Sequence, residues 1–219
     1  LPPPPKPEVR QVIEALPTPA PLPALGDSDN LVLDALAGLI DNKTLLHIFR
    51  AERIIRHIVA TIDNLPRQEA PAGKMPVKPV GGPFLVERNS AGMTIDPTNA
   101  RRYVRYLEIM AAVAVRRLVD LYVGFYPVFQ QAYRELGYPH GRFNDRVVDT
   151  LDDLLATPDV APPIAVTQPK VLYEFADPAL EKRSAGQKIM MRMGADNMAR
   201  AKRLLSAIRS ELLRRSPSK

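Results

Sequence analysis

Cysteine and tryptophan are both absent from the 219 residues, and histidine occurs only three times. Without cysteine the chain has no disulfide, no thiolate nucleophile and no Cys-ligated zinc or iron–sulfur centre. His47, His57 and His140 are too few and too scattered to predict a histidine-ligated zinc site. We therefore expect no cofactor and no metal. The alternative is a carboxylate-only calcium or magnesium site, but Asp149, Asp152 and Asp153 are better explained as a solvated helix face.

Long apolar runs are also missing. No stretch of eighteen or more apolar residues occurs, so the sequence contains no transmembrane helix. The standard motifs of phosphate loops (GxxxxGK[ST]), dinucleotide folds (GxGxxG), zinc peptidases (HExxH) and serine hydrolases (GxSxG) are absent as well. The sequence thus indicates no established catalytic class.

Proline is abundant at the N-terminus, where residues 1–25 contain nine of the 23 prolines. Proline fixes φ and removes the amide donor, so this segment is expected to be extended, near polyproline II. We predict a semi-rigid tether over residues 1–25, with a ligand for a proline-recognition domain as the alternative. The sequence begins at Leu1 rather than Met, and we expect a further segment before it.

The remainder has helical periodicity. Apolar spacing, caps and breakers predict helices at about 28–40, 44–49, 52–65, 97–136 with breaks near 113–115 and at Pro127, 144–155, 184–193 and 196–213. Two short extended runs around residues 89–92 predict a hairpin that must pack on the helices, and a further short extended piece is expected at Ile164–Val166. The fold class is therefore mainly α, an irregular domain of about eight helices over residues 26–215 with one small β-hairpin and a disordered tail at 216–219.

Positive charge is concentrated near the C-terminus. Residues 177–219 contain eleven Lys and Arg against four Asp and Glu, so they carry more than the whole net charge of +6. This pattern is typical of a solvated helix face, and it also permits binding to a polyanion or an anionic lipid surface. Nucleic acid is not expected as a partner, because the aromatic residues are not interleaved with the basic ones.

Two stretches are richer in polar residues than a plain helical bundle requires. The first, residues 129–146, joins two helices through a Tyr-Pro-x-Gly turn; the second, residues 168–178, is a loop. The candidate ligand-binding residues are Gln130, Tyr133, Arg134, Asn144, Asp145, Arg146, Gln168, Lys170, Tyr173 and Glu174. The alternative is structural: Asn144 or Asp145 caps the next helix, the tyrosines bury their rings, and the amides satisfy loop carbonyls.

The same stretches carry a family resemblance. The patterns FQQAYRELGYPxGxFNDR (129–146) and QPKVLYEFADP…SAGQK…RMG (168–194), with Asp34–Leu36 and Ile58–Pro66, resemble bacterial domain of unknown function family 3014. The resemblance covers nearly everything after residue 25. It implies one N-terminal transmembrane segment, a proline-rich stretch and then this domain in the periplasm, held at the inner membrane by a segment that precedes the sequence. It transfers no activity.

Three functions remain open. The first is a membrane-tethered extracytoplasmic binding domain without catalysis, whose partner is an envelope protein or a cell-wall component. The second is an envelope glycan or peptide hydrolase, with Glu174 or Glu135 as general acid and Asp145 as the second carboxylate, at a separation of roughly 5–10 Å. The third is polyanion binding through the C-terminal helix, which would weaken steeply as salt rises.

Overall fold

The computed structural model describes residues 22–39, 48–71, 73, 75–90 and 92–215. All but the last four residues of the predicted tether, most of the helix predicted at 44–49 and the tail at 216–219 lie outside these ranges. None of the helices within them combines the length and the apolar character that a membrane span requires.

Helices dominate the described residues, which confirms the predicted fold class. In chain order the elements are α1 (Asp29–Leu39), α2 (Ile54–Asn64), β1 (Val86–Asn89), β2 (Gly92–Ile95), α3 (Arg101–Ala112), α4 (Val115–Gly124), α5 (Tyr126–Glu135), α6 (Phe143–Leu155), β3 (Ala165–Thr167), β4 (Glu174–Phe175), α7 (Pro178–Glu181), α8 (Ala185–Arg192) and α9 (Ala195–Arg215). Short 3-10 helices cover Leu25–Asp27 and Pro97–Ala100.

Several helix boundaries follow directly from local chemistry. The side chain of Asp96 accepts a hydrogen bond from the Thr98 amide and caps the 3-10 helix that leads into α3. Extended backbone at Val113 divides α3 from α4, and Pro127 lies in the first turn of α5. Ser184 caps α8 by accepting from the Gln187 amide. Each of these boundaries was predicted from the sequence.

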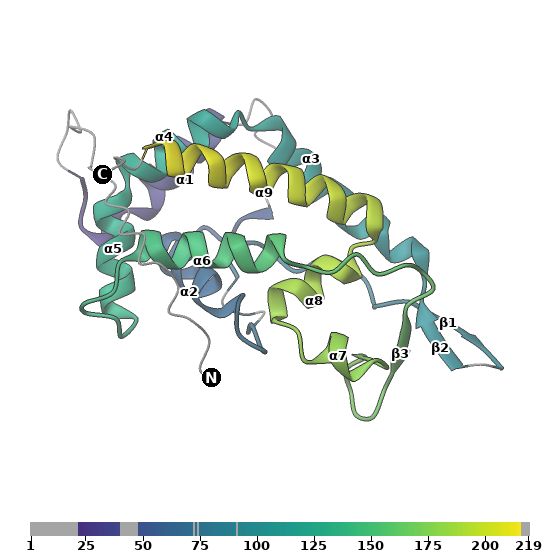
Figure 1. Cartoon of the computed structure of the whole chain (residues 1–219). Coiled ribbons are helices and arrows are strands. Elements are labelled where there is room, and N and C mark those ends of the chain that lie inside the picture. Colours follow the sequence, from purple (N-terminus) through teal and green to yellow (C-terminus); the bar gives the residue numbers. More distant parts are fainter. Residues whose placement is uncertain (1–21, 40–47, 72, 74, 91, 216–219) are drawn as a thin grey trace.

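Helix α9 is the longest element and runs along the bundle (Figure 1). It packs against α3, α4 and α6, while α2 packs against α5 and α6. The main core forms where α1, α2, α5 and α6 meet, around the fully buried side chains of Val32, Ile54, Ile55 and Phe143. The apolar residues of these helices are spaced so that they lie on one face of each helix, and these faces meet to form the core.

The sheet is larger than the predicted hairpin: β3 forms where a short extended piece was expected, but its pairing with the hairpin and the strand β4 were not predicted. Beside the expected hairpin of β1 and β2, the strands β3 and β4 add to its edge in the order β1-β2-β3-β4, antiparallel throughout. Met93 pairs with Val166, and Thr167 pairs with Glu174. The pairing of β2 with β3 joins segments about seventy residues apart, so periodicity within either segment could not reveal it.

Candidate functional site

Gln130, a predicted ligand residue, lies buried on α5 and holds the α5–α6 turn (residues 136–142). Its Oε1 accepts from the Tyr126 hydroxyl at 3.0 Å and from the Phe143 amide at 2.9 Å. Its Nε2 donates to the Gly141 carbonyl at 2.8 Å. Both ends of the carboxamide are therefore engaged by the fold, as the structural alternative expected.

Tyr133 stabilises the same turn through its ring. It is buried and stacks on Tyr138, with centroids 4.5 Å apart and an interplanar angle of 15°. Gly141 lies against this pair: a Cβ there would come within 2.9 Å of Tyr133 Cε1. The Tyr-Pro-x-Gly sequence thus builds a close-packed aromatic turn rather than an open binding loop.

Arg146 belongs to a charged cluster at the foot of this turn, the Asp63 cluster, which comprises Asp63, Arg67, Tyr138 and Arg146. The Asp63 carboxylate is buried and pairs with Arg67 Nη2 at 2.7 Å and Arg146 Nε at 3.2 Å. The Tyr138 hydroxyl donates to Asp63 Oδ2 at 3.2 Å. Asp63 raises the pKa of the Arg67 guanidinium, chiefly through its negative charge.

The predicted cap at Asn144 or Asp145 is wrong by about two residues. Helix α6 starts at Phe143 after Arg142, and no side chain caps it. Asn144 is instead fully buried, where its Oδ1 accepts from the Tyr122 hydroxyl at 3.4 Å and its Nδ2 has no partner among the described residues. Burial raises the pKa of Asp145, against the opposing charge of Arg142. The fifth predicted residue here, Arg134, lies exposed on α5.

The second predicted group occupies the β3–β4 turn (residues 168–173) and the start of β4. Gln168 Nε2 donates to the Val171 carbonyl at 3.1 Å, and Lys170 is exposed. The Tyr173 ring lies 5.6 Å from that of Phe84. Glu174 is half-buried in β4. The turn is thus restrained by a hydrogen bond within it and by a ring contact with Phe84.

Two large aliphatic side chains at the tip of this turn remain in solvent. Val171 is 84% exposed and Leu172 is 76% exposed, well above the other exposed large apolar residues of the described chain, which reach at most 46%. The sequence predicted a loop over residues 168–178, whereas the structure has a turn at 168–173 followed by β4 and the start of α7. The prediction named the polar residues of this segment and missed the two apolar ones. In the sequence, Val171 and Leu172 could have been recognised as an apolar pair inside an otherwise polar loop.

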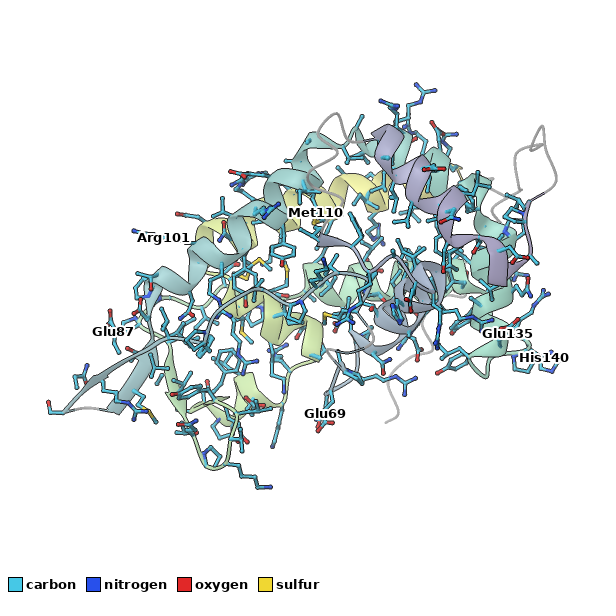
Figure 2. All side chains as sticks on the ribbon, turned by 180° about the vertical axis from the view of Figure 1, so that it is seen from behind. Glu69, Glu87, Arg101, Met110, Glu135 and His140 are labelled. Atoms are coloured by element: carbon cyan, nitrogen blue, oxygen red, sulfur yellow. The ribbon has the colours of Figure 1, made fainter. Side chains whose placement is uncertain are left out.

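The two predicted groups do not form one site. In Figure 1, α5 lies at one end of the molecule and the sheet with α7 at the other. Figure 2 agrees from behind: Glu135 and His140, beside the α5–α6 turn, lie far from Glu87 on β1. Asp145 lies in the first turn of α6, next to the α5–α6 turn, and Glu174 lies in β4 of the sheet, an arrangement that does not favour their pairing as catalytic carboxylates.

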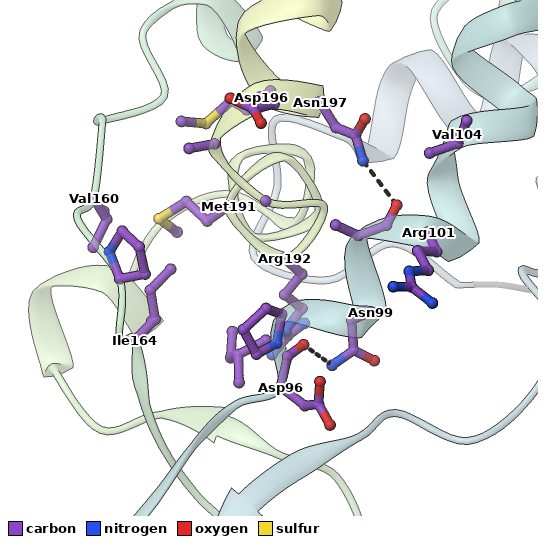
Figure 3. A pocket seen from close by; sticks show the side chains of 17 residues that line it. Asp96, Asn99, Arg101, Val104, Val160, Ile164, Met191, Arg192, Asp196 and Asn197 are labelled. Carbon is purple, nitrogen blue, oxygen red and sulfur yellow. Dashed lines mark hydrogen bonds between the residues drawn. The ribbon is translucent and has the colours of Figure 1, made fainter.

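A cleft of about 480 Å³ lies between the 3-10 helix, the α8–α9 corner and the segment before β3 (Figure 3). Apolar side chains such as Val104, Ile164 and Met191 form much of its wall. The polar groups of Asp96 and Asn197 also line it, but Asp96 caps Thr98 and Asn197 Nδ2 donates to the Ala100 carbonyl at 2.8 Å. Size and lining are those of a small-molecule site.

Arg192 links this cleft to the β3–β4 turn. Its Nη2 donates to the Tyr173 carbonyl at 2.9 Å, and its guanidinium lies 4.9 Å from the Phe175 ring centroid. Burial lowers the pKa of this guanidinium, although nearby Glu181 opposes the effect. In the sequence, Arg192 stood out only within the RMG tripeptide of the family resemblance and was given no role. Its partners lie on other elements, so helix spacing carried no signal for it.

The basic residues of α9 are largely paired with carboxylates. Lys202 Nζ lies 2.8 Å from Asp159 Oδ1, Arg209 pairs with Asp152 of α6, and Arg215 pairs with Asp120 of α4. These ion pairs dock α9 on its neighbours. Among the described residues, no group of three His, Asp or Glu side chains could hold a metal ion.

Comparison with known proteins gives one match. The family model described as Protein of unknown function (DUF3014) matches residues 54–209, which is more than half of the chain. The range includes both polar stretches and Arg192 but leaves out Asp34–Leu36, which the sequence resemblance had included. No curated protein and no solved structure matches the chain.

Proposed function

We propose that this chain, which belongs to the DUF3014 family, is a non-catalytic binding domain that contacts a partner protein through the β3–β4 turn. The observation that carries the proposal is the exposure of Val171 and Leu172, 84% and 76%, at the tip of that turn. Burying a valine or leucine side chain gains roughly 1.5–3 kcal/mol. A partner with an apolar pocket would recover this free energy, which the isolated domain forgoes.

The β3–β4 turn is already ordered by contacts within the domain. Gln168 fixes the Val171 carbonyl, Arg192 fixes the Tyr173 carbonyl, and Phe84 supports the Tyr173 ring. A turn that is already ordered loses less conformational entropy when it binds. Exposed Lys170 beside the apolar pair would favour a pocket with an acidic rim.

The proposed setting is the bacterial envelope. The family resemblance implies a membrane anchor ahead of the proline-rich segment, with the domain in the periplasm. In that setting residues 1–25 would act as a spacer that holds the turn away from the membrane. The partner would then be an envelope protein; a cell-wall component is the other possibility.

The two alternative functions have less support. A hydrolase that pairs Glu174 with Asp145 has little support, because the first turn of α6 and the sheet lie far apart (Figure 1). The other expected general acid, Glu135, pairs with Arg56, and hydrogen bonds from Gln131 and Arg56 lower its pKa, whereas a general acid needs a raised pKa. Polyanion binding would need several free cations on α9, whereas Lys202, Arg209 and Arg215 pair with carboxylates and leave mainly Arg203 exposed.

Site-specific photo-cross-linking of the full-length protein in intact cells tests the proposal. A photoreactive amino acid replaces Val171 or Leu172, and the matched control replaces Leu136, which is 43% exposed at the other end of the molecule. We expect one discrete protein adduct shared by positions 171 and 172 and absent at 136. The double variant Val171→Ser, Leu172→Ser should lose that partner with an unchanged unfolding midpoint.

Two outcomes would refute the proposal. Adducts that are the same at all three positions would show that the contact is non-specific. A partner that is captured equally well by the double variant would place the interface away from the β3–β4 turn.

A further inference from the structure

A separate space lies inside the helical bundle. This central cavity has a volume of about 340 Å³ and lies between α1, α2, α4, α5, α6 and α9. Its wall is made of aliphatic and aromatic carbon, and representative lining residues are Leu36, Ile58, Leu118, Leu205 and Ile208. The cavity shares no residue with the β3–β4 turn, so a ligand bound in it would be independent of the function proposed above.

The cavity wall offers no polar group to a ligand. Its two polar lining residues, Tyr122 and Thr150, direct their hydroxyls to protein acceptors. Tyr122 donates to Asn144 Oδ1 at 3.4 Å, and Thr150 Oγ1 lies 2.9 Å from the Ile62 carbonyl and 2.7 Å from that of Arg146. A buried water needs two to four polar partners, so water is a poor occupant here. An apolar molecule meets no such difficulty.

The volume is large for a space lined by core side chains, and the space is partly open rather than sealed. Protein cores are close-packed and leave few voids larger than a water molecule. A dry cavity of about 150 Å³ is already sufficient to bind benzene. The central cavity is about twice as large, so its walls forgo many dispersion contacts that a bound hydrocarbon would restore.

The shape of the space distinguishes between apolar ligands. A second apolar pocket, of about 110 Å³, shares Leu36, Leu118 and Ile208 with the central cavity. It continues to Val113 and to Met110, which is 40% exposed on α3 (Figure 2). The three shared side chains make the two spaces neighbours, and the smaller one lies beside the break between α3 and α4. A linear chain can extend from one space into the other when these side chains change rotamer, which a compact ring system cannot do.

We propose that the central cavity binds the alkyl chain of a fatty acid, which enters beside Met110 and leaves its carboxylate in solvent. Recognition would be by chain length, since the wall contacts only carbon. The ester-linked chain of a phospholipid offers the same chemistry, so the test includes it separately.

Displacement of a fluorescent fatty acid, dansyl-undecanoic acid, from the full-length protein tests this inference. We expect saturable binding of one probe per chain, displaced by dodecanoic acid and dodecanol but at least tenfold less effectively by butyric acid. Vesicles of phosphatidylglycerol should displace it only if a lipid chain can enter. Stronger displacement by dodecanoic acid than by vesicles of equal acyl-chain concentration would support the fatty acid as ligand. Equal or stronger displacement by the vesicles would overturn it in favour of a lipid.

Cavity-filling variants provide the structural control. Ile208→Phe and Leu118→Phe each place extra volume where the two spaces meet, whereas Leu213→Phe adds the same ring on α9 outside the lining. We expect the first two to weaken probe binding at least tenfold without lowering the unfolding temperature, and Leu213→Phe to bind normally. The proposal would be overturned if the wild type did not bind the probe. It would also be overturned if Ile208→Phe and Leu118→Phe both lowered the unfolding temperature and still bound the probe as the wild type does.

Discussion

The Arg192 guanidinium lies 4.9 Å from the centre of the Phe175 ring and donates to the carbonyl of Tyr173, so one side chain of α8 holds both ends of the β4 region. Because β4 is only two residues long, it has little pairing of its own. The β3–β4 turn therefore depends on a contact from a helix rather than on the sheet.

Replacing Arg192 should destabilise the domain and release this turn. A desolvated cation–π contact contributes about 2 kcal/mol, and a hydrogen bond from a charged donor contributes roughly 1.5–3 kcal/mol. We expect Arg192→Ala to lower the free energy of unfolding by about 2–4 kcal/mol in urea titrations, given these contributions and their partial overlap. Amide exchange should also accelerate in residues 168–175.

Arg203 supplies the matched control, because it is exposed on α9. Arg203→Ala should change the free energy of unfolding by no more than about 0.5 kcal/mol. Equal stability of the two variants would show that Arg192 is not a tether of β4.

The Asp63 cluster gives a second prediction. Asp63→Asn removes the charge that faces Arg146 and Arg67 but keeps the side-chain volume. Loss of one partner from a buried ion pair costs about 3–5 kcal/mol, and the partial exposure of Arg67 reduces this, so we expect about 2–4 kcal/mol in chemical denaturation.

The control for this variant is Glu135→Gln, at the exposed ion pair with Arg56. The side chains of that pair are 39% and 45% exposed, so its loss should leave the unfolding midpoint almost unchanged. If the two variants were equally stable, the Asp63 cluster would contribute no more to stability than the exposed ion pair of Arg56 and Glu135.

Most helix boundaries were predictable from local chemistry, the start of α6 being an exception, and long-range contacts were not predictable. The Asp96-Pro97 start of the helical run and its break at Val113 follow from residues that act on their immediate neighbours. Asp63, by contrast, was missed because Tyr138 and Arg146 lie 75 and 83 residues away. The polar stretch around Gln130 was recognised as unusual, but its contacts show that it serves the α5–α6 turn. A density of polar residues therefore did not distinguish binding from folding.

Gly186 makes a third prediction possible, because α8 approaches the end of α2 at this residue. The Gly186 amide donates to the Leu65 carbonyl at 2.8 Å, and a Cβ at Gly186 would lie 2.5 Å from Leu154 Cδ2 and 3.2 Å from that carbonyl. Gly186→Ala should therefore displace the buried Leu154 side chain and crowd the Leu65 carbonyl, at a cost of about 1–3 kcal/mol, as overpacking does.

Gly124, the last residue of α4, is the control for this substitution, since a Cβ there would meet nothing within 4 Å. Gly124→Ala should stabilise the domain by about 0.4–1 kcal/mol, because alanine lowers the conformational entropy of the unfolded chain. Differential scanning calorimetry should show shifts of opposite sign; shifts of the same sign would contradict the close approach of α8.

The pKa values of Asp145 and Glu181 predict opposite dependences of stability on pH. Burial raises the pKa of Asp145 above its ordinary 3.8. The folded state then binds the proton more tightly than the unfolded state. The contribution of Asp145 to stability is therefore present below pH 3.8 and is lost as pH rises through its folded pKa. For Glu181, burial is outweighed by hydrogen bonds from Lys188 and the Phe175 amide, and the pKa falls below its ordinary 4.5.

The contribution of Glu181 is therefore present above pH 4.5 and is lost as pH falls through its folded pKa. Urea titrations between about pH 3 and 7 test both groups, with each variant compared to the wild type at every pH. The stability of Asp145→Asn relative to the wild type should rise with pH, and that of Glu181→Gln should fall. If Asp145→Asn also fell, the first-turn position of Asp145 on α6 would outweigh its burial, because a helix N-terminus favours the ionised carboxylate.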